Sequence, residues 1–181
     1  GWKAEILEGT KPNESGLVQP HPILIVNYDI LGQRRGTQAG SGWLDYLKRL
    51  RPKLVIVDES HMISSRKAKR SKWVRELCQD VPHVIALTGT PLTNRPAELW
   101  QVLNLLRPAL YPSFWSFAEA HCSPTLKPWG WDYSGANDLP LLHQRLLRSC
   151  MIRRLKKDVL SQLPPKQRLV VPVGIDNLPE Y

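Results

Sequence analysis

The first hundred residues alternate between short apolar runs and longer amphipathic stretches. The runs predict strands at 23–27, 54–57 and 84–87 and an edge strand at 4–8, and the run that ends at Val57 is rich in β-branched residues. The amphipathic stretches predict helices at 43–50, 68–79 and 96–106. Strands that alternate with helices predict an α/β fold, with a mainly parallel sheet and helices on both of its faces.

The pattern changes beyond Pro108. Apolar spacing predicts helices at 114–122 and 139–152, and a segment rich in Pro, Trp and Gly at 123–137 joins them. A last apolar stretch at 166–173 predicts a strand that returns to the sheet. The second half is therefore expected to add a helical protrusion to the sheet-containing part.

Two adjacent carboxylates follow the apolar run at 54–57. Asp58 and Glu59 stand at its end, and His61 comes two residues later. Desolvating two like charges is costly unless a cation compensates, so this pair indicates Mg²⁺ carried by a nucleotide. Asp58 is then the expected metal ligand and Glu59 the group that orients the attacking water. His61, the last member of this motif, is expected to couple to Thr88 or Thr90. The alternative is a capping or core histidine.

A polar turn follows the run at 84–87. Thr88, Gly89 and Thr90 precede Pro91, which prevents the strand from continuing. The carboxyl ends of parallel strands meet at one sheet edge, so the two threonine hydroxyls are expected near Asp58 and Glu59. The competing interpretation is a plain strand-to-helix turn.

These motifs together resemble the SWI/SNF-like ATPases of helicase superfamily two. The resemblance includes Asp-Glu-Ser-His at 58–61, Leu-Thr-Gly-Thr-Pro at 87–91 and Arg-Pro-Ala-Glu-Leu-Trp at 95–100. It extends to the strand and Tyr-acid motif at 25–31, the basic signature at 151–160 and Leu-Pro-Pro-Lys at 163–166. The segment 129–139, with His143, further resembles the annealing-helicase (HARP-like) branch.

The resemblance implies the first RecA-like lobe of a motor that uses ATP and Mg²⁺. It divides the chain into the C-terminal portion of that lobe (1–108), a protrusion with the basic signature (109–165), and a return strand with the start of a linker (166–181). It places Arg153 and Arg154 near the nucleotide cleft and the junction with a second lobe. The implied partners are double-stranded or branched DNA and the second helicase lobe of the same parent chain.

The family's phosphate-binding loop is missing from this sequence. No G-x-x-x-x-G-K-[ST] segment occurs, and the glycine-rich patch at 36–42 lacks the lysine. We therefore expect a fragment that lacks this loop and the second lobe and hydrolyses essentially no ATP alone. Residues 62–65 also replace the aromatic and Lys-Asn that usually follow the histidine, so the local contacts of that turn are expected to differ.

Charge indicates a polyanionic partner. The 181 residues carry a net charge of +9, and the pI is about 9.7. The residues expected to contact nucleic acid are Asn27, Tyr28, Arg66, Lys67, Lys69 and Arg70. For the basic residues the alternative is a solvated helix face, and for Tyr28 it is core packing.

Composition also bears on location. No run of eighteen apolar residues occurs, so a membrane partner is not expected. Three widely spaced cysteines suit free thiols inside a cell, in the cytoplasm if the source is bacterial or viral and in the nucleus if it is eukaryotic. The function expected is part of an ATP-dependent translocase on double-stranded DNA. The alternative is a non-catalytic DNA-binding or scaffold module that retains the helicase fold.

Overall fold

The chain forms two compact units, Gly1–Cys150 and Met151–Tyr181. The structure is a computed structural model that describes residues 2–9, 12, 23–32, 42–92, 94–160, 162, 167–169 and 171. Each unit is described by itself, and the domain boundaries expected at 108 and 165 stay predictions.

The strands of the first unit pair in parallel, as predicted. Strand β1 (Ala4–Leu7) pairs with β2 (Ile23–Val26), and β3 (Leu54–Val57) pairs with β4 (His83–Ala86). All four lie within a residue or two of the apolar runs that predicted them. The parallel α/β fold is therefore confirmed, although the described hydrogen bonds form two strand pairs rather than one continuous sheet.

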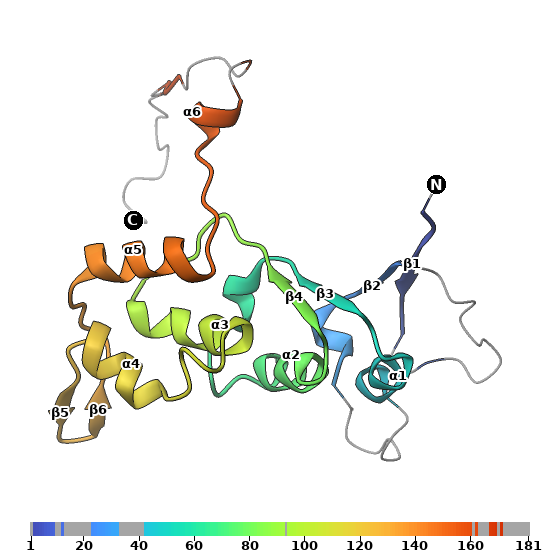
Figure 1. Cartoon of the computed structure of the whole chain (residues 1–181), viewed down its shortest axis with the longest axis horizontal. Helices are drawn as coiled ribbons and strands as arrows, with labels where there is room; N and C mark the ends of the chain where they lie inside the picture. Colours follow the sequence, from blue (N-terminus) through green and yellow to red (C-terminus); the bar gives the residue numbers. More distant parts are fainter. Residues whose placement is uncertain are drawn as a thin grey trace, which may run out of the picture. The chain divides into compact units, whose positions relative to one another are not determined.

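One face of these strands builds the core. Helices α1 (Trp43–Leu50) and α2 (Lys69–Cys78) pack on this face together with the short 3-10 helix η1 (Tyr28–Ile30) (Figure 1). The shared cluster is Leu7, Leu31, Trp43, Leu44, Leu47, Val57, Ile63, Val74, Leu77 and Cys78. The period of 3.6 residues in α1 explains the fit, since Trp43, Leu44 and Leu47 fall on one side of the helix.

The opposite face of the strands is apolar and exposed. The side chains that alternate with the core residues are Ile6, Ile23, Ile25, Leu54, Ile56 and Ile85. Helices were predicted on both faces, but the described part of the chain places them on one only.

The remaining elements of the first unit are mainly helical. After η2 (Ser60–Ile63) and α2 come η3 (Pro96–Glu98), α3 (Leu99–Leu106), α4 (Phe114–His121) and α5 (Leu139–Ser149). The helix predicted to reach Ile152 ends at Ser149. At this end the guanidinium of Arg107 donates to the carbonyl of Ser149, one of the last carbonyls of the helix, which has no partner within it.

A hairpin occupies the segment expected to be irregular. Strands β5 (Thr125–Lys127) and β6 (Gly130–Asp132) pair antiparallel. The turn ends at Gly130, whose φ of 122° favours glycine. Three residues per strand are too few to produce a clear alternating pattern, so the sequence alone did not predict it.

The second unit contains α6 (Lys156–Val159). The strand predicted at 166–173 lies largely outside the described residues, and its described part, 167–169 and 171, has no regular structure. Within the parts of the chain that the structure describes, no helix combines the length and the hydropathy needed to cross a membrane.

Candidate active site

The two carboxylates stand at the carboxyl end of β3 and face solvent. Glu59 has φ 46° and ψ 50°, a left-handed conformation that turns the chain from the strand into η2. Its backbone N–H donates to the Asp58 side chain over 2.9 Å. The turn thus presents both acids at the edge where open α/β sheets bind ligands.

Backbone hydrogen bonds extend the pairing of β3 and β4 past the strand ends. Leu87 N–H donates to Val57 O over 2.9 Å, and Ser60 N–H donates to Leu87 O over 2.8 Å. The chain after β4 therefore continues beside η2, which brings Thr88 next to His61.

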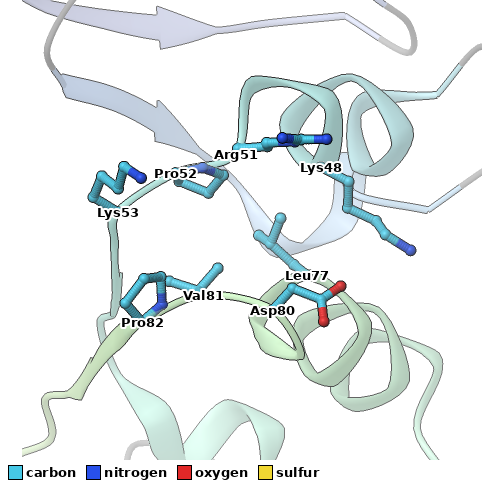
Figure 2. Close-up of a pocket in the computed structure, with 8 residues that line it drawn as sticks. All are labelled: Lys48, Arg51, Pro52, Lys53, Leu77, Asp80, Val81 and Pro82. Atoms are coloured by element: carbon cyan, nitrogen blue, oxygen red, sulfur yellow. The ribbon is translucent and has the colours of Figure 1, made fainter.

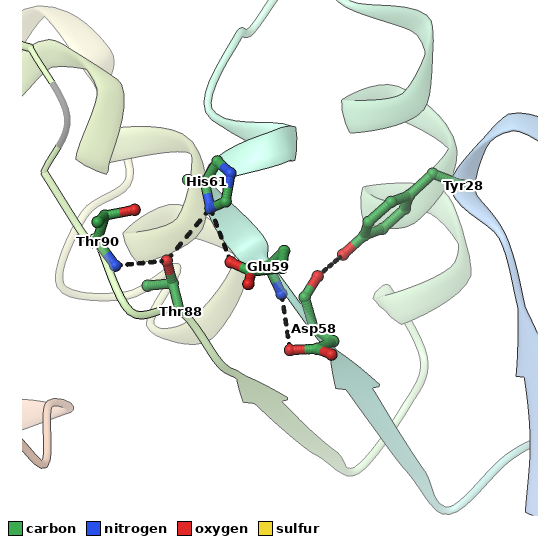
Figure 3. Close-up of polar contacts among 6 residues, drawn as sticks. All are labelled: Tyr28, Asp58, Glu59, His61, Thr88 and Thr90. Carbon is green, nitrogen blue, oxygen red and sulfur yellow. Dashed lines mark hydrogen bonds and ion pairs between the residues drawn. The ribbon is translucent and has the colours of Figure 1, made fainter. Parts of the chain in front are cut away.

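His61 links the acidic motif to the threonine turn (Figure 3). Its Nδ1 lies 3.1 Å from Glu59 Oε2 and 3.3 Å from Thr88 Oγ1. A carboxylate can only accept, so a proton carried on Nδ1 of His61 is donated to Glu59. Thr88 Oγ1 also accepts from the backbone N–H of Thr90 over 3.1 Å. Thr90 thus joins this network through its backbone.

The carboxylate oxygens of Asp58 and Glu59 fit Mg²⁺ only if a bound nucleotide supplies further ligands. Carboxylate oxygens are the groups that Mg²⁺ prefers, and it commonly takes one or two of them together with waters and substrate phosphates. No cluster of three or more His, Cys, Asp or Glu side chains able to hold a metal occurs among the described residues. Asp58 could thus supply one ligand to a nucleotide-borne Mg²⁺, while the amides and lysine of a phosphate loop are absent from this sequence.

Tyr28 belongs to this site rather than to a separate surface. Its phenol donates to the carbonyl of Asp58 over 2.5 Å. Burial, aided by the charges of Asp58, Cys78 and Glu59, raises the pKa of Tyr28 to about 12. Asn27 caps η1 by accepting from Asp29 N–H over 3.0 Å. Contacts of these two residues with nucleic acid stay predictions.

The basic residues after the acidic motif differ in their surroundings. The guanidinium carbon of Arg66 lies 3.2 Å from the ring centroid of Phe114 and 5.9 Å from that of Trp100. Burial lowers the pKa of Arg66. Lys67 and Lys69 are exposed, and Arg70 is half-buried. The guanidinium of Arg66 therefore packs on aromatic rings, although the residue as a whole is exposed like Lys67 and Lys69.

The arginines of the basic signature lie in the second unit. Arg153 and Arg154 are exposed there. Their assignment to the nucleotide cleft stays a prediction.

Two supports of the site had no clear signal in the sequence. Ser71 is buried on α2 and donates its hydroxyl to Ile63 O over 2.9 Å, which fixes the end of η2. The stacking of Arg66 on Phe114 joins residues 48 positions apart, beyond the reach of local patterns.

A pocket of about 400 Å³ lies at the other end of β3 and β4 (Figure 2). Its lining is Lys48, Arg51, Pro52, Lys53, Leu77, Asp80, Val81 and Pro82. Several of these residues follow the C-terminal ends of α1 and α2, where cations offset the negative end of the helix dipole. It lies at the amino ends of the strands, so the acidic edge remains the candidate active site.

Comparisons with known proteins agree on one family. The profile of the SNF2-related domain matches residues 5–180. The chain is 39% identical over 156 residues to the SWI/SNF-related matrix-associated actin-dependent regulator of chromatin subfamily A-like protein 1 of Xenopus laevis, covering 86% of this chain and 15% of that protein. It is 42% identical over 164 residues to the DNA annealing helicase and endonuclease ZRANB3 of Mus musculus, covering 88% of this chain and 15% of the relative.

A solved structure shows the same fold. The Sulfolobus solfataricus SWI2/SNF2 ATPase core in complex with dsDNA superposes with a TM-score of 0.63 at 24% identity, covering 90% of this chain and 31% of that one. The chain spans about 15% of the length of the two relatives described above.

Proposed function

The chain belongs to the SNF2-related domain family, and from this membership we propose that it forms part of the first lobe of an ATP-driven motor that moves along double-stranded DNA. ATP hydrolysis, strand annealing and movement along DNA are activities of the whole protein in this proposal. The chain alone is expected to be inactive, because its sequence carries no phosphate loop.

The observation that carries the proposal is the position of His61 between Glu59 and Thr88. A histidine within 3.1 Å of one acid and 3.3 Å of a hydroxyl on the neighbouring strand's turn couples two loops at the ligand-binding edge. Burial does not explain this arrangement, because Asp58 and Glu59 are exposed. A site that meets a charged ligand does explain it.

The proposed chemistry divides between the two acids. When bound, Mg-ATP supplies the phosphoryl group that water attacks. Asp58 would hold the metal, and Glu59 would orient the water and accept its proton. His61 holds the Glu59 carboxylate in place, and Thr88 accepts from the same imidazole. Gly89 and Thr90 then transmit the movement of this turn to the surface that follows β4.

Charge supports DNA as the partner. A net charge of +9 favours a polyanion, and Lys67 and Lys69 expose their cations after the acidic motif. Phosphate contacts carry no sequence information, so binding is expected to be sequence-independent and steeply salt-dependent. The solved relative was captured with dsDNA, and a related mouse protein is named a DNA annealing helicase.

A second lobe completes the proposed motor. We assign it to the same parent protein, with Arg153 and Arg154 facing the shared nucleotide cleft. The relatives from frog and mouse are named for chromatin and DNA, so in a eukaryotic cell we place the protein in the nucleus.

The test is DNA-stimulated ATPase of the full-length protein that contains this chain. Glu59→Gln keeps the size of the side chain but removes the carboxylate, and we expect turnover to fall at least a hundredfold while the fold is retained. Glu76→Gln is the matched control, because Glu76 is a similarly exposed acid that pairs with Lys48 on α1. If wild type and Glu59→Gln were equally inactive yet bound DNA, the non-catalytic scaffold would replace the motor.

A further inference from the structure

The β5–β6 hairpin exposes large aromatic and apolar side chains. Trp129, in its turn, is 83% exposed. Leu126 and Trp131 are direct cross-strand partners and are 69% and 47% exposed. Trp115 of α4 adds a ring at 4.7 Å from that of Trp131. A contiguous apolar surface of this kind commonly marks an interaction site.

Packing against neighbouring elements supports this small hairpin. Strands of three residues form a marginal hairpin in water, so other contacts must stabilise it. Tyr133, just after β6, lies 4.9 Å from Phe114 and 6.3 Å from Trp115 in edge-on packing. Arg66 stacks on the Phe114 ring. The aromatic cluster therefore mounts the hairpin on α4 and on the loop that follows the acidic motif.

One cation of the hairpin, Lys127, lies beside its turn, where it pairs with Gly130. Lys127 is exposed on β5. Hydrogen bonds from Ser134 lower the pKa of Asp132 at the base of the hairpin, and the positive charges of Lys127 and Arg95 lower it further. Exposed aromatic rings flanked by cations are the combination that binds single-stranded nucleic acid, because rings stack on bases and cations attract phosphates.

We propose that the exposed tip of the β5–β6 hairpin, centred on Trp129, stacks on unpaired bases where DNA strands separate or rejoin. The inference rests on the proposed DNA motor and adds a contact with single-stranded DNA to it. Duplex bases are already stacked on each other and leave no face free for an indole, so the hairpin distinguishes branched from fully paired DNA. Because the contacts of Tyr133 with Phe114 and Trp115 hold the hairpin in place, less conformational entropy is lost when it stacks on a base.

The experiment measures the affinity of the full-length protein for two DNAs of equal length. One is a fork with single-stranded arms, and the other is a blunt duplex. Trp129→Ala should weaken binding to the fork by about tenfold, as loss of one base–aromatic stack does. Binding to the duplex should stay within about twofold. Trp129→Phe keeps a ring and should retain most of the fork affinity.

Trp2→Ala is the matched control, because Trp2 is also 83% exposed and lies outside the hairpin. It should change neither affinity. Circular dichroism of Trp129→Ala should match wild type, since an exposed turn side chain contributes little to folding.

Each outcome decides the matter. If Trp129→Ala weakened binding to the fork and to the duplex equally, or weakened neither, the proposed role of the hairpin would be wrong. The proposed DNA motor would still stand in that case, provided that the wild-type protein bound the duplex. Failure of wild type to bind any DNA would instead contradict the motor itself.

Discussion

Tyr28 donates its phenolic hydrogen to the backbone carbonyl of Asp58, 30 residues further along the chain. The bond joins the end of β2 to the end of β3, two strands that share no ladder hydrogen bonds. It therefore holds the backbone of Asp58 against the β1–β2 pair. The second acid, Glu59, is held by His61, which also contacts Thr88 after β4.

Tyr28→Phe should lower the free energy of unfolding by about 1 kcal/mol, the usual net value of one hydrogen bond. The ring still packs against the core, so the core itself should remain intact. Urea unfolding of the chain measures this difference. A loss above about 3 kcal/mol would mean that the ring, rather than the hydroxyl, had been disturbed.

Tyr28 should also make stability depend on alkaline pH. Burial chiefly, then the Asp58 charge, raises its pKa from 10.0 to about 12, so the folded state favours the neutral phenol. Its contribution is complete below pH 10 and is lost as the pH rises from 10 to 12. The stability difference between wild type and Tyr28→Phe should therefore shrink over that range. Burial raises the pKa of the Cys78 thiol to about 11 in both proteins, so the comparison cancels its effect.

Thr88 and Thr90 should differ sharply on substitution. Thr88→Val removes the hydroxyl that meets His61 and accepts from Thr90 N–H, so we expect DNA-stimulated ATPase of the full-length protein to fall about tenfold. Thr90→Val keeps the backbone N–H and should stay within about twofold of wild type. Equal effects would show that the hydroxyl network does not position Glu59.

Arg66 and Lys67 should separate stability from DNA binding. Arg66→Ala removes the guanidinium stacked on Phe114 and should cost about 1–2 kcal/mol in urea unfolding. Lys67→Ala should cost less than about 0.5 kcal/mol but reduce the salt dependence of DNA affinity by a slope of about 0.9. If Arg66→Ala, and not Lys67→Ala, reduced the salt dependence of DNA affinity, Arg66 rather than Lys67 would contact DNA.

Gly32 is a site where added volume should be harmful. A Cβ there would lie 1.9 Å from the Trp73 ring, far inside van der Waals contact. Gly32→Ala should destabilise the chain by about 1–3 kcal/mol, because the indole on α2 must move. Trp73→Leu in the same chain should recover part of that loss. Additive losses in the double variant would rule out the clash as the cause.

The sequence predicted the elements around the acidic edge with small errors. The apolar runs before Asp58 and Thr88 set the strands within a residue or two, because aliphatic residues favour strands and each run ends where polar residues begin. Parallel pairing then placed His61 and Thr88 together, as the strand order implied.

What the sequence could not predict depends on distant contacts. The hairpin at 125–132 is too short for a pattern, and aromatic packing between Trp115 and Trp131 stabilises it. The stacking of Arg66 on Phe114 had no signal in the sequence, and the DNA contact expected of Arg66 stays a prediction. The helix predicted to reach Ile152 stops at Ser149, where Arg107 meets its last turn.

The uncovered aliphatic face of β1–β4 has a consequence for amide hydrogen exchange. Two-stranded pairs with water on one side open readily, so their amides should exchange rapidly in the chain by itself. Any polypeptide that settles over Ile25 and Ile56 would slow that exchange. The deuterium uptake of these four strands should therefore report how much of their exposed face the surrounding protein covers.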